Sequence, residues 1–392
     1  MTRIAIVGGS IGGLTAACLL RDSGHDVTVF ERSSHELEQR GAGIGFLEGA
    51  SRYLINCVGV DINSISISTP YIRYLSRRNE IVHQQAHQYR FSNWNTVYRR
   101  LLEAYGYERY RLNHELIDWE AIENKVALKF SNGSEFQVDL LICADGVGSK
   151  SRSRLLPHTP TNYAGYVAWR GMVPESKLAP ELRTKLSEAI TYHVFANSHI
   201  LVYPIPALDG SIKPGKRLIN FVWYRNYLNG GDLNDLLTDN DGKQRQLSVP
   251  PGKMESHHLA EARATAVARL PADIASVVLA AEELFTQAVH DIEVERMAFG
   301  RVCLLGDAAF VARPHAAAGT AKAADDGWHL ARCLNEYSKI GEALSEWERR
   351  QLCVGRSLVA RTRLIGNSSQ VENNWVPGDP QLLFGLLNAG DR

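Results

Sequence analysis

Short, mostly apolar runs without alternation recur along the chain, and a helix-like segment separates the first two. They cover residues 4–7 (IAIV) and 27–30 (VTVF), and residues 14–21 between them are mainly small and apolar. A short unbroken run of this kind is typical of a parallel strand buried on both faces. The pattern predicts a strand–helix–strand unit of about 30 residues.

Two later runs have the same form, at residues 140–144 (LLICA) and 302–305 (VCLL). In an open parallel sheet, ligands bind just outside the carboxyl ends of the strands. Each of the four runs is followed within two residues by a glycine or a carboxylate, so we expect these following residues to line one crevice. They are Gly8, Glu31, Asp145 and Asp307.

The pattern changes between residues 163 and 293, where longer segments are rich in aromatic and β-branched residues. The segments YAGYVAWRG, ITYHVFANSHILVYPIP and RLINFVWYRN alternate in part between apolar and polar positions. Such alternation is typical of antiparallel strands that are covered on one face. We expect residues 71–91 to add a strand pair to this sheet, and the polar residues 229–251 to form a surface excursion.

The chain from residue 341 onward has the periodicity of a helix with one apolar face. That face is made of Leu344, Trp347, Val354 and Leu358. The apolar segment PQLLFGLL follows near the end of the sequence. We expect it to dock either on the chain's own body or on a partner.

Together these elements predict an α/β fold. A Rossmann-like nucleotide-binding domain of discontinuous segments carries an inserted mixed or antiparallel β-sheet domain for the substrate, and C-terminal helices follow. We expect the nucleotide-binding domain at residues 1–70, 92–162 and 294–340. The β-sheet domain is expected at 71–91 and 163–293, and the helical segment at 341–392.

Composition and charge remove several classes of function. The 43 basic and 43 acidic residues cancel, which gives no electrostatic case for nucleic acid or an anionic membrane. The six cysteines show no C-x-x-C pair and no metal-ligand spacing, so we expect reduced thiols, no metal and a cytoplasmic location. No apolar run is long enough for a transmembrane helix, and the first one is too short for a signal peptide.

The loop after the first strand, in RIAIVGGSIGGL, departs from the dinucleotide pattern G-x-G-x-x-G at one position. Gly8 and Gly13 supply the outer glycines, and Ser10 replaces the middle one. A small side chain is tolerable beside a pyrophosphate, and its hydroxyl can itself donate to phosphate. Glu31 ends the second strand, where a carboxylate accepts hydrogen bonds from an adenosine ribose and disfavours a 2′-phosphate. The loop therefore predicts FAD or NAD; a glycine turn in an unrelated α/β fold is the alternative.

Two further segments show a family resemblance. ICADGVGSKSR (142–152) and LLGDAAFVARPHAAAGTAKAADDG (304–327) resemble the second and third signatures of the class A flavoprotein aromatic hydroxylases, the para-hydroxybenzoate hydroxylase type. The resemblance spans nearly the whole chain, and YAGYVAWRG, YPIP and RPHAAAG are most similar to the dihydroxypyridine hydroxylases. It implies a GR2-type FAD domain and NADH or NADPH as a transient co-substrate. It also implies O₂-dependent hydroxylation of a small electron-rich, hydroxylated aromatic or N-heteroaromatic ring, through a flavin C4a-hydroperoxide.

The resemblance also implies roles for single residues. The glycine loop would hold the pyrophosphate, Glu31 the adenosine ribose and Asp307 the ribityl chain, while residues 314–319 would pass beside the flavin ring. Phe310 departs from the family, which usually has histidine there, and AAAG replaces a more glycine-rich form. The implied FAD-binding residues are Gly8, Ser10, Ile11, Gly13, Glu31, Arg32, Arg40, Asp145, Gly146, Asp307, Pro314 and Gly319.

For catalysis the first candidate is His315, because it follows Pro314 in the loop expected beside the flavin and histidine can move protons near neutral pH. The alternative is a helix-start or core histidine that is hydrogen-bonded to the backbone. The inserted sheet supplies Tyr203 and Tyr224, for which core packing is the alternative. Arg170 either pairs with an anionic substrate or has a structural role. With a side-chain period of two, only half of the other sheet candidates can face the pocket: Tyr192, His193, His199 and Trp223.

Three rival functions stay open at this point. The same scaffold could perform epoxidation or Baeyer–Villiger oxidation, the chain could be an NAD-dependent dehydrogenase, or it could carry a flavin without turnover. A yellow purified protein would exclude the dehydrogenase, and substrate-stimulated NAD(P)H consumption would exclude the non-catalytic carrier. The expected partners are the aromatic substrate, O₂ and NAD(P)H, with a homodimer as a further possibility.

Overall fold

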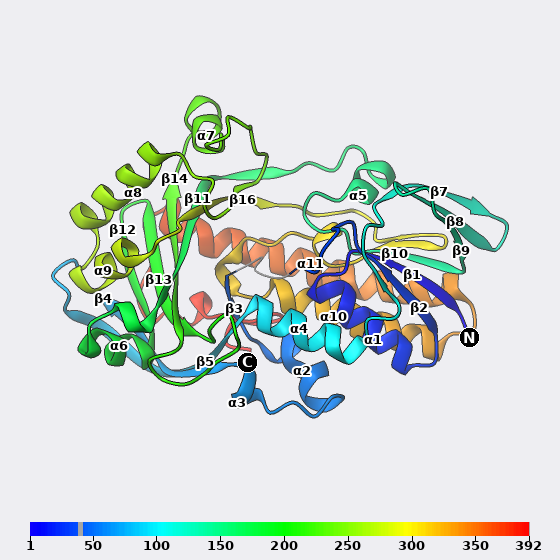
Figure 1. The fold of residues 1–392 in the computed structure, drawn as a ribbon, viewed down its shortest axis with the longest axis horizontal. Coiled ribbons are helices and arrows are strands. Elements are labelled where there is room, and N and C mark those ends of the chain that lie inside the picture. Colours follow the sequence, from blue (N-terminus) through cyan, green and yellow to red (C-terminus); the bar gives the residue numbers. More distant parts are fainter. Residues whose placement is uncertain (38–41, 392) are drawn as a thin grey trace.

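The computed structural model describes residues 1–37 and 42–391 of the chain. Two large sheets lie towards opposite ends of the longest axis, and helix α11 (Ile340–Gln370) runs between them (Figure 1). α11 contacts strands of both sheets and also packs on helix α10 (Gly319–Glu336). One long helix therefore joins the two halves of the molecule.

The sheet near the N-terminus has six strands in the order β17-β18-β10-β1-β2-β6. All neighbours are parallel except β17 and β18. The four apolar runs of the sequence form its adjacent strands β18, β10, β1 and β2, so their carboxyl ends meet at one edge, as predicted. The strand bounds are β1 Arg3–Val7, β2 Asp26–Phe30, β6 Tyr110–Arg111, β10 Leu140–Cys143, β17 Ala298–Phe299 and β18 Val302–Leu304.

Small residues let the helices of this half pack closely. Helix α1 (Ile11–Asp22) lies against α10 and α4 (Trp94–Tyr105). A Cβ atom added to Gly327 of α10 would lie 3.0 Å from the Cα atom of Ala16 of α1. The predicted helix after the glycine loop is therefore confirmed, and it is held by a contact that leaves no room for a larger side chain.

Two further parts of this half were not predicted. An antiparallel meander of three strands, β7 (Leu116–Ile122), β8 (Lys125–Phe130) and β9 (Glu135–Val138), precedes β10. Short helices fill other connections. They are α2 Glu48–Asn56, α3 Ile62–Ile65 and α5 Lys150–Leu155.

The second large sheet has nine strands in the order β15-β16-β11-β14-β13-β12-β4-β5-β3. Its neighbours are antiparallel except β12 and β4, which are parallel. The mixed sheet predicted from the aromatic segments is therefore confirmed. Its strands are β3 Gly43–Gly45, β4 Ile67–Leu75, β5 Ile81–Asn93, β11 Asn162–Pro174, β12 Ala189–Phe195, β13 Ser198–Ile205, β14 Leu218–Asn226, β15 Ser248–Val249 and β16 Phe285–Asp291.

The two faces of this sheet belong to different cores. On β14, Phe221 and Trp223 belong to the same core as helices α8 (Ser256–Arg269) and α9 (Ala272–Ala280). Val222 and Tyr224 point the other way and join the core of the nucleotide-binding half. The remaining short elements are η1 Glu175–Lys177, α6 Pro180–Ser187, α7 Gly231–Leu236, η2 Gly306–Ala308, η3 Pro314–Ala316 and η4 Pro380–Leu382.

The C-terminal segment after α11 folds back onto the chain's own body. Phe384 is 4% exposed, and its backbone N–H donates to the hydroxyl of Tyr89 at 2.8 Å. The N–H of Gly385 donates to the carbonyl of Ala316 at 3.1 Å. The segment PQLLFGLL is thus docked within the molecule, against the loop that precedes α10.

The predicted division of the chain into domains stays a prediction. Near the expected boundary at residue 71, the strands of the nine-stranded sheet do not follow the predicted division. The nine-stranded sheet includes β3 and begins β4 at Ile67, before the expected boundary at residue 71. None of the described helices is both long and apolar enough to cross a membrane.

Candidate functional site

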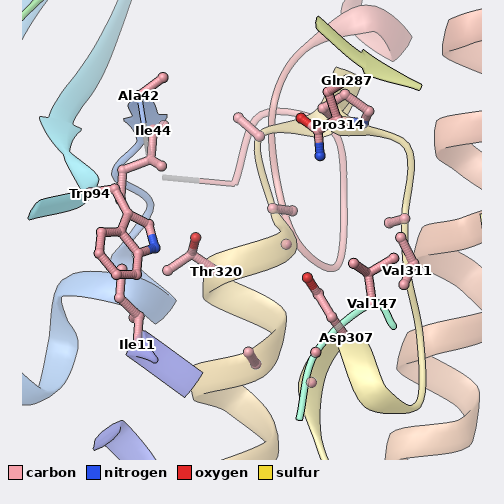
Figure 2. A pocket seen from close by; sticks show the side chains of 18 of the residues that line it. Ile11, Ala42, Ile44, Trp94, Val147, Gln287, Asp307, Val311, Pro314 and Thr320 are labelled. Atoms are coloured by element: carbon pink, nitrogen blue, oxygen red, sulfur yellow. The ribbon is translucent and has the colours of Figure 1, made fainter. Parts of the chain in front are cut away.

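Two adjoining cavities lie at the carboxyl edge of the parallel sheet. The larger has a volume of about 450 Å³ and is bounded on one side by the glycine loop and η2, and on the other by the nine-stranded sheet. The smaller, of about 200 Å³, lies beside β2. They share Ser10, Ala144 and Gly146 in their walls. In Figure 2, Trp94 and Ile44 lie on one side of the larger cavity, and Asp307 and Val147 on the other.

The glycine loop has the shape of a phosphate cradle. Gly8 has a φ of +105°, and a Cβ atom there would lie 2.1 Å from the carbonyl oxygen of Ala144. A Cβ atom on Gly13 would lie 1.9 Å from the carbonyl oxygen of Gly8. α1 begins at Ile11, and the hydroxyl of Ser10 does not cap it, so the first N–H groups of the helix stay free for an anion.

Glu31 is fixed beside this loop. The residue is 5% exposed, and its carboxylate accepts hydrogen bonds from the N–H groups of Gly9 and Ser33, both at 2.9 Å. A carboxylate has about four acceptor positions, so others stay available for ribose hydroxyls in the smaller cavity. Arg32 lines that cavity too, whereas Arg40 lies outside the described residues.

Asp145 and Gly146 follow β10 and also line the smaller cavity. The Asp145 carboxylate accepts from the Ser149 hydroxyl at 2.6 Å and from the Ser151 N–H at 3.1 Å. These bonds tie the carboxylate to the start of α5. Gly146 has a φ of +80°, which brings the backbone to the wall of both cavities.

Asp307 points into the larger cavity from η2. The residue is exposed towards this cavity, and the protein atoms packed around its carboxyl raise the pKa of that group to about 6, although Lys322 and Arg152 oppose the shift. Lys322 is itself paired with the buried Asp326 at 2.7 Å, and Asp326 accepts from the Gly306 N–H at 2.9 Å. This pair fixes the backbone that carries Asp307, and no sequence pattern had pointed to it.

The loop from Pro314 to Gly319 forms another wall of the larger cavity. Ala317 has a φ of +52°, which turns the chain into α10. β3 closes against it so tightly that a Cβ atom on Gly45 would lie 2.5 Å from that of Ala317. Pro314 and Gly319 line the cavity as expected of that loop.

The departure at Phe310 has a local explanation. Its ring is 3% exposed and lies against α11, where a Cβ atom on Gly355 would approach it to 2.5 Å. The ammonium of Lys322 lies 4.9 Å from the ring centroid. Glycine in α11 thus makes room for a phenyl ring at this position.

His315 does not lie where its predicted role required. It is absent from the described lining of either cavity, and its Nε2 atom lies 2.7 Å from the hydroxyl of Tyr166. Its ring centroid lies 4.5 Å from that of Tyr224. Burial lowers the pKa of His315 well below the usual value, and the neighbouring His199 and Arg313 lower it further. A neutral imidazole is therefore packed behind the cavity wall.

Tyr203 and Tyr224 both line the larger cavity. The Tyr203 hydroxyl donates to the Gly43 carbonyl at 3.1 Å, and its ring stacks on Phe91 at 4.2 Å. The Tyr224 hydroxyl has no hydrogen-bond partner among the described residues. Burial raises the pKa of Tyr203 to about 12 and raises that of Tyr224 further, despite the opposing charge of Arg170. Both phenols are therefore protonated at neutral pH.

The other aromatic candidates of the sheet lie away from both cavities. Trp223 faces α8 and α9, and its Nε1 atom donates to Ser198 at 3.0 Å. Tyr192 stacks on Tyr74, and His193 bonds to the carbonyl of Leu75. His199 lies behind Tyr224, with ring centroids 4.5 Å apart. Further lining residues went unrecognised in the sequence, since they come from distant segments: Ile44, Phe91, Trp94, Phe285, Gln287, His290 and Phe384.

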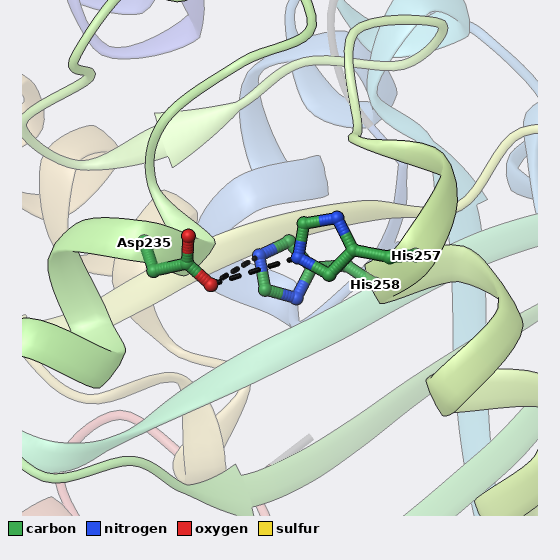
Figure 3. Close-up of side chains that lie close together, drawn as sticks. All are labelled: Asp235, His257 and His258. Atoms are coloured by element: carbon green, nitrogen blue, oxygen red, sulfur yellow. Dashed lines mark ion pairs between the residues drawn. The ribbon is translucent and has the colours of Figure 1, made fainter.

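A separate group of possible metal ligands lies on the surface. Asp235 of α7 meets His257 and His258 of α8, with Oδ2 to Nε2 distances of 3.6 and 3.3 Å (Figure 3). No metal-ligand spacing was recognised in the sequence because the carboxylate and the two histidines belong to different helices. The Asp235 and His257 side chains are 66% and 61% exposed, and none of the three residues lines either cavity.

Comparison with known proteins agrees with this geometry. A family model described as an FAD binding domain-like domain matches residues 163–291, and one described as an NAD(P)-binding Rossmann-like domain matches residues 6–36. The chain is 37% identical to 2,6-dihydroxypyridine 3-monooxygenase of Paenarthrobacter nicotinovorans, over 98% of this chain and 96% of that protein. It is 27% identical to 3-amino-4-hydroxybenzoate 2-monooxygenase of Streptomyces cremeus, over 85% and 78% of the two chains.

Solved structures give the same result. That of 2,6-dihydroxypyridine-3-hydroxylase from Arthrobacter nicotinovorans superimposes with a TM-score of 0.93 and 35% identity, over 99% of this chain and 98% of that one. Klebsiella pneumoniae HpxO complexed with FAD and uric acid shares the fold, with a TM-score of 0.76 and 22% identity over 97% and 90% of the chains. The chain therefore belongs to the class A flavoprotein aromatic hydroxylases, a family of FAD-dependent monooxygenases.

Proposed function

We propose that this chain hydroxylates a small ring of the 2,6-dihydroxypyridine type, using NADH or NADPH and O₂. The observation that carries this proposal is the larger cavity, which continues from the glycine loop into a chamber walled by Phe91, Tyr203 and Tyr224. An aromatic-walled chamber of this kind suits a flat ring. A relative that shares 37% of its residues over 98% of this chain is named for that substrate.

We also propose how FAD is held. The free N–H groups at the start of α1 suit a pyrophosphate, the Glu31 carboxylate suits the adenosine ribose, and Asp307 suits the ribityl hydroxyls. Gly8 and Gly13 allow the loop to fold this tightly around the start of α1, since any side chain there would collide with main-chain atoms. The roles of Ser10, Ile11, Arg32, Arg40, Asp145, Gly146, Pro314 and Gly319 stay predictions on the same basis.

When bound, FAD supplies hydride acceptance from the nicotinamide and the activation of O₂. The protein's part is to position the ring and exclude water. We assign Tyr224 to substrate contact, because its protonated hydroxyl faces the cavity without a described partner. Tyr203 holds β3 through the Gly43 carbonyl and offers its ring as a wall. His315 is reassigned to positioning Tyr224, against which its ring packs.

The test is turnover by the purified FAD-loaded protein. NAD(P)H oxidation and O₂ uptake are followed with and without 2,6-dihydroxypyridine, and the product is analysed by mass spectrometry. Strong stimulation with one oxygen atom added supports the proposal, and it separates hydroxylation from non-catalytic flavin binding. Stimulation without added oxygen makes the compound an effector only. Absence of stimulation rejects the pyridine and directs the search to other hydroxylated rings.

Two further points belong to the same proposal. All six cysteines are free, which suits a reducing compartment such as the cytoplasm. A homodimer stays a prediction, and the mass of the protein in solution tests it. Fractionation of cells that express the chain would test its compartment.

A further inference from the structure

Arg170 lies on the cavity face of the nine-stranded sheet. It alternates on β11 with Trp169, which belongs to the core beneath α8 and α9. It pairs with Val222 of β14, and Val222 pairs with Leu201 of β13. All three of these residues line the larger cavity. The guanidinium therefore belongs to the middle of the sheet wall, between the rows that carry Tyr203 and Tyr224.

Arg170 has no counter-ion in the described part of the chain. Its Nε atom is buried without a hydrogen-bond partner, and no described carboxylate lies within 4.0 Å of its nitrogens. Asp307, the carboxylate among the described lining residues, forms no ion pair with it. A positive charge facing a chamber of largely apolar wall is costly unless an anion joins it.

Two buried charged groups elsewhere in this protein have ionic partners, in contrast to Arg170. The fully buried carboxylate of Asp291 meets Arg313 at 2.8 Å and Arg363 at 2.6 Å. The buried Lys322 is paired with Asp326 at 2.7 Å. At these two sites the fold supplies an ionic partner, whereas the described residues supply none for Arg170.

The neighbouring tyrosines do not provide the missing negative charge. Burial keeps the pKa of Tyr203 at about 12 and that of Tyr224 above its usual range, although Arg170 lowers both. His290 of β16 also lines the cavity, and burial lowers its pKa, so it is neutral at neutral pH. The anion that completes this wall must come from a ligand.

We propose that Arg170 binds the ring substrate as its anion, through the oxygen of a deprotonated ring hydroxyl; this inference rests on the proposed function. The hydroxyl releases its proton to solvent water as the ring binds, and no other bond changes. The planar guanidinium can donate two N–H groups to one oxygen or to an oxygen and a ring nitrogen. The negative charge raises the electron density of the ring, which favours attack by an electrophilic oxygen.

The test measures binding without turnover, in the FAD-loaded protein and without NAD(P)H. The probe is 2,6-dihydroxypyridine, and its ionisation when bound is read from its ultraviolet difference spectrum at a pH about one unit below its own pKa. The wild type is expected to give the spectrum of the anion. Arg170→Gln is expected to bind about 10- to 100-fold more weakly and to lose the anion spectrum, and Arg170→Lys is expected to retain part of both.

Two controls separate this role from packing. Arg225→Gln removes an arginine of β14 that pairs with Glu261 of α8 on the opposite side of the sheet, and binding should be unchanged. The neutral ring 2,6-dimethylpyridine should bind wild type and Arg170→Gln alike above its own pKa. FAD content and thermal unfolding identify any variant that fails to fold.

Several results would overturn the inference. They are unchanged affinity in Arg170→Gln, an anion spectrum that persists without Arg170, equal loss of the neutral ring, or failure of the wild type to bind the hydroxylated probe. The proposed function fails in a different way. If the ring binds as its anion but is never oxygenated during turnover, the anion site stands and the proposed reaction does not.

Discussion

Glu31 is the residue that we propose to hold the adenosine ribose. Its carboxylate is held by two backbone N–H groups, so its position is set before any ligand arrives. An amide at this position would turn an N–H₂ group towards one of those donors. The substitution therefore disturbs both the loop and the ribose contact, without removing much volume.

We expect Glu31→Gln to weaken FAD binding by about 10- to 100-fold, since a hydrogen bond to a charged acceptor contributes about 1.5–3 kcal/mol. The dissociation constant of FAD for the apoprotein, from the quenching of flavin fluorescence, measures this. Glu120→Gln, at an exposed position of the three-stranded meander, is the matched control. Wild-type affinity in Glu31→Gln would exclude the ribose role.

His199 gives the protein a defined acid sensitivity. Burial lowers its pKa to about 3 in the folded protein, while the unfolded chain has a pKa near 6.5. Between these values the unfolded state binds a proton that the folded state does not. The free energy of unfolding should therefore fall as pH decreases from about 6.5, by at most about 1.4 kcal/mol per pH unit from this group.

Urea unfolding of the FAD-loaded protein at several pH values between about 4.5 and 7.5 tests this. His199→Phe should show a shallower decline than wild type, whatever its absolute stability. His158→Gln, an exposed histidine in the turn after α5, should decline as steeply as wild type. Equal slopes in His199→Phe and wild type would contradict the expectation.

Alternation could predict the direction of strand side chains but not that of a loop histidine. Tyr203 and Tyr224 share the cavity face because both belong to regular strands. His315 belongs to η3, a single 3₁₀ turn ended by the left-handed Ala317, and no sequence period fixes a side chain there. His315 is buried against Gly366 of α11, and this helix position lies about fifty residues later in the chain.

At the scale of elements, α10 supports the loop that faces the cavity, and its contact with α1 sets its position. At Gly327 an added Cβ atom would lie only 3.0 Å from the Cα atom of Ala16. Alanine has the higher helix propensity, by about 1 kcal/mol. Propensity and packing therefore predict opposite effects of a substitution here.

We expect Gly327→Ala to destabilise the protein by about 1–3 kcal/mol, because overpacking outweighs propensity. Gly341→Ala near the start of α11, where an added Cβ atom meets nothing within 4 Å, should instead stabilise it by up to about 1 kcal/mol. Urea unfolding measures both. A stabilised Gly327→Ala would show that the two helices can separate without loss.

The four strands and the glycine loop could be predicted because their signals are local. Each strand is an apolar run followed by its ligand-facing residue, and β1, α1 and β2 are consecutive in the chain. The meander β7–β9 was missed because exposed positions interrupt the apolar residues of its strands. β3 was missed because its three residues are identified only by pairing with β5, far along the sequence.

At the scale of the whole molecule, the segment after α11 closes one side of the larger cavity. Phe384 of this segment lines the cavity, and backbone hydrogen bonds tie the segment to Tyr89 of β5 and to Ala316 of the loop before α10. The sequence left open whether PQLLFGLL docks within the chain or on a partner, because an apolar pattern does not specify the surface against which it packs. The long-range contacts settle the point.

Phe384→Ala should open this wall, weaken the binding of the ring substrate by about 10-fold and admit water to the site. Substrate affinity and the fraction of consumed NAD(P)H recovered as hydroxylated product are the measurements, and both should fall. Leu387→Ala, at a side chain that is 50% exposed, should change neither. Unaltered affinity and product yield in Phe384→Ala would show that the Phe384 side chain contributes neither to substrate binding nor to the exclusion of water.

The wall made by Phe384 also has a consequence for biosynthesis. Phe384 follows every strand of both sheets in the chain, so a growing chain can complete both sheets while one side of its ligand chamber is still missing. Enclosure of the substrate is therefore a late step of folding during synthesis, and a nascent chain stalled before residue 384 should hold a chamber that is open on this side.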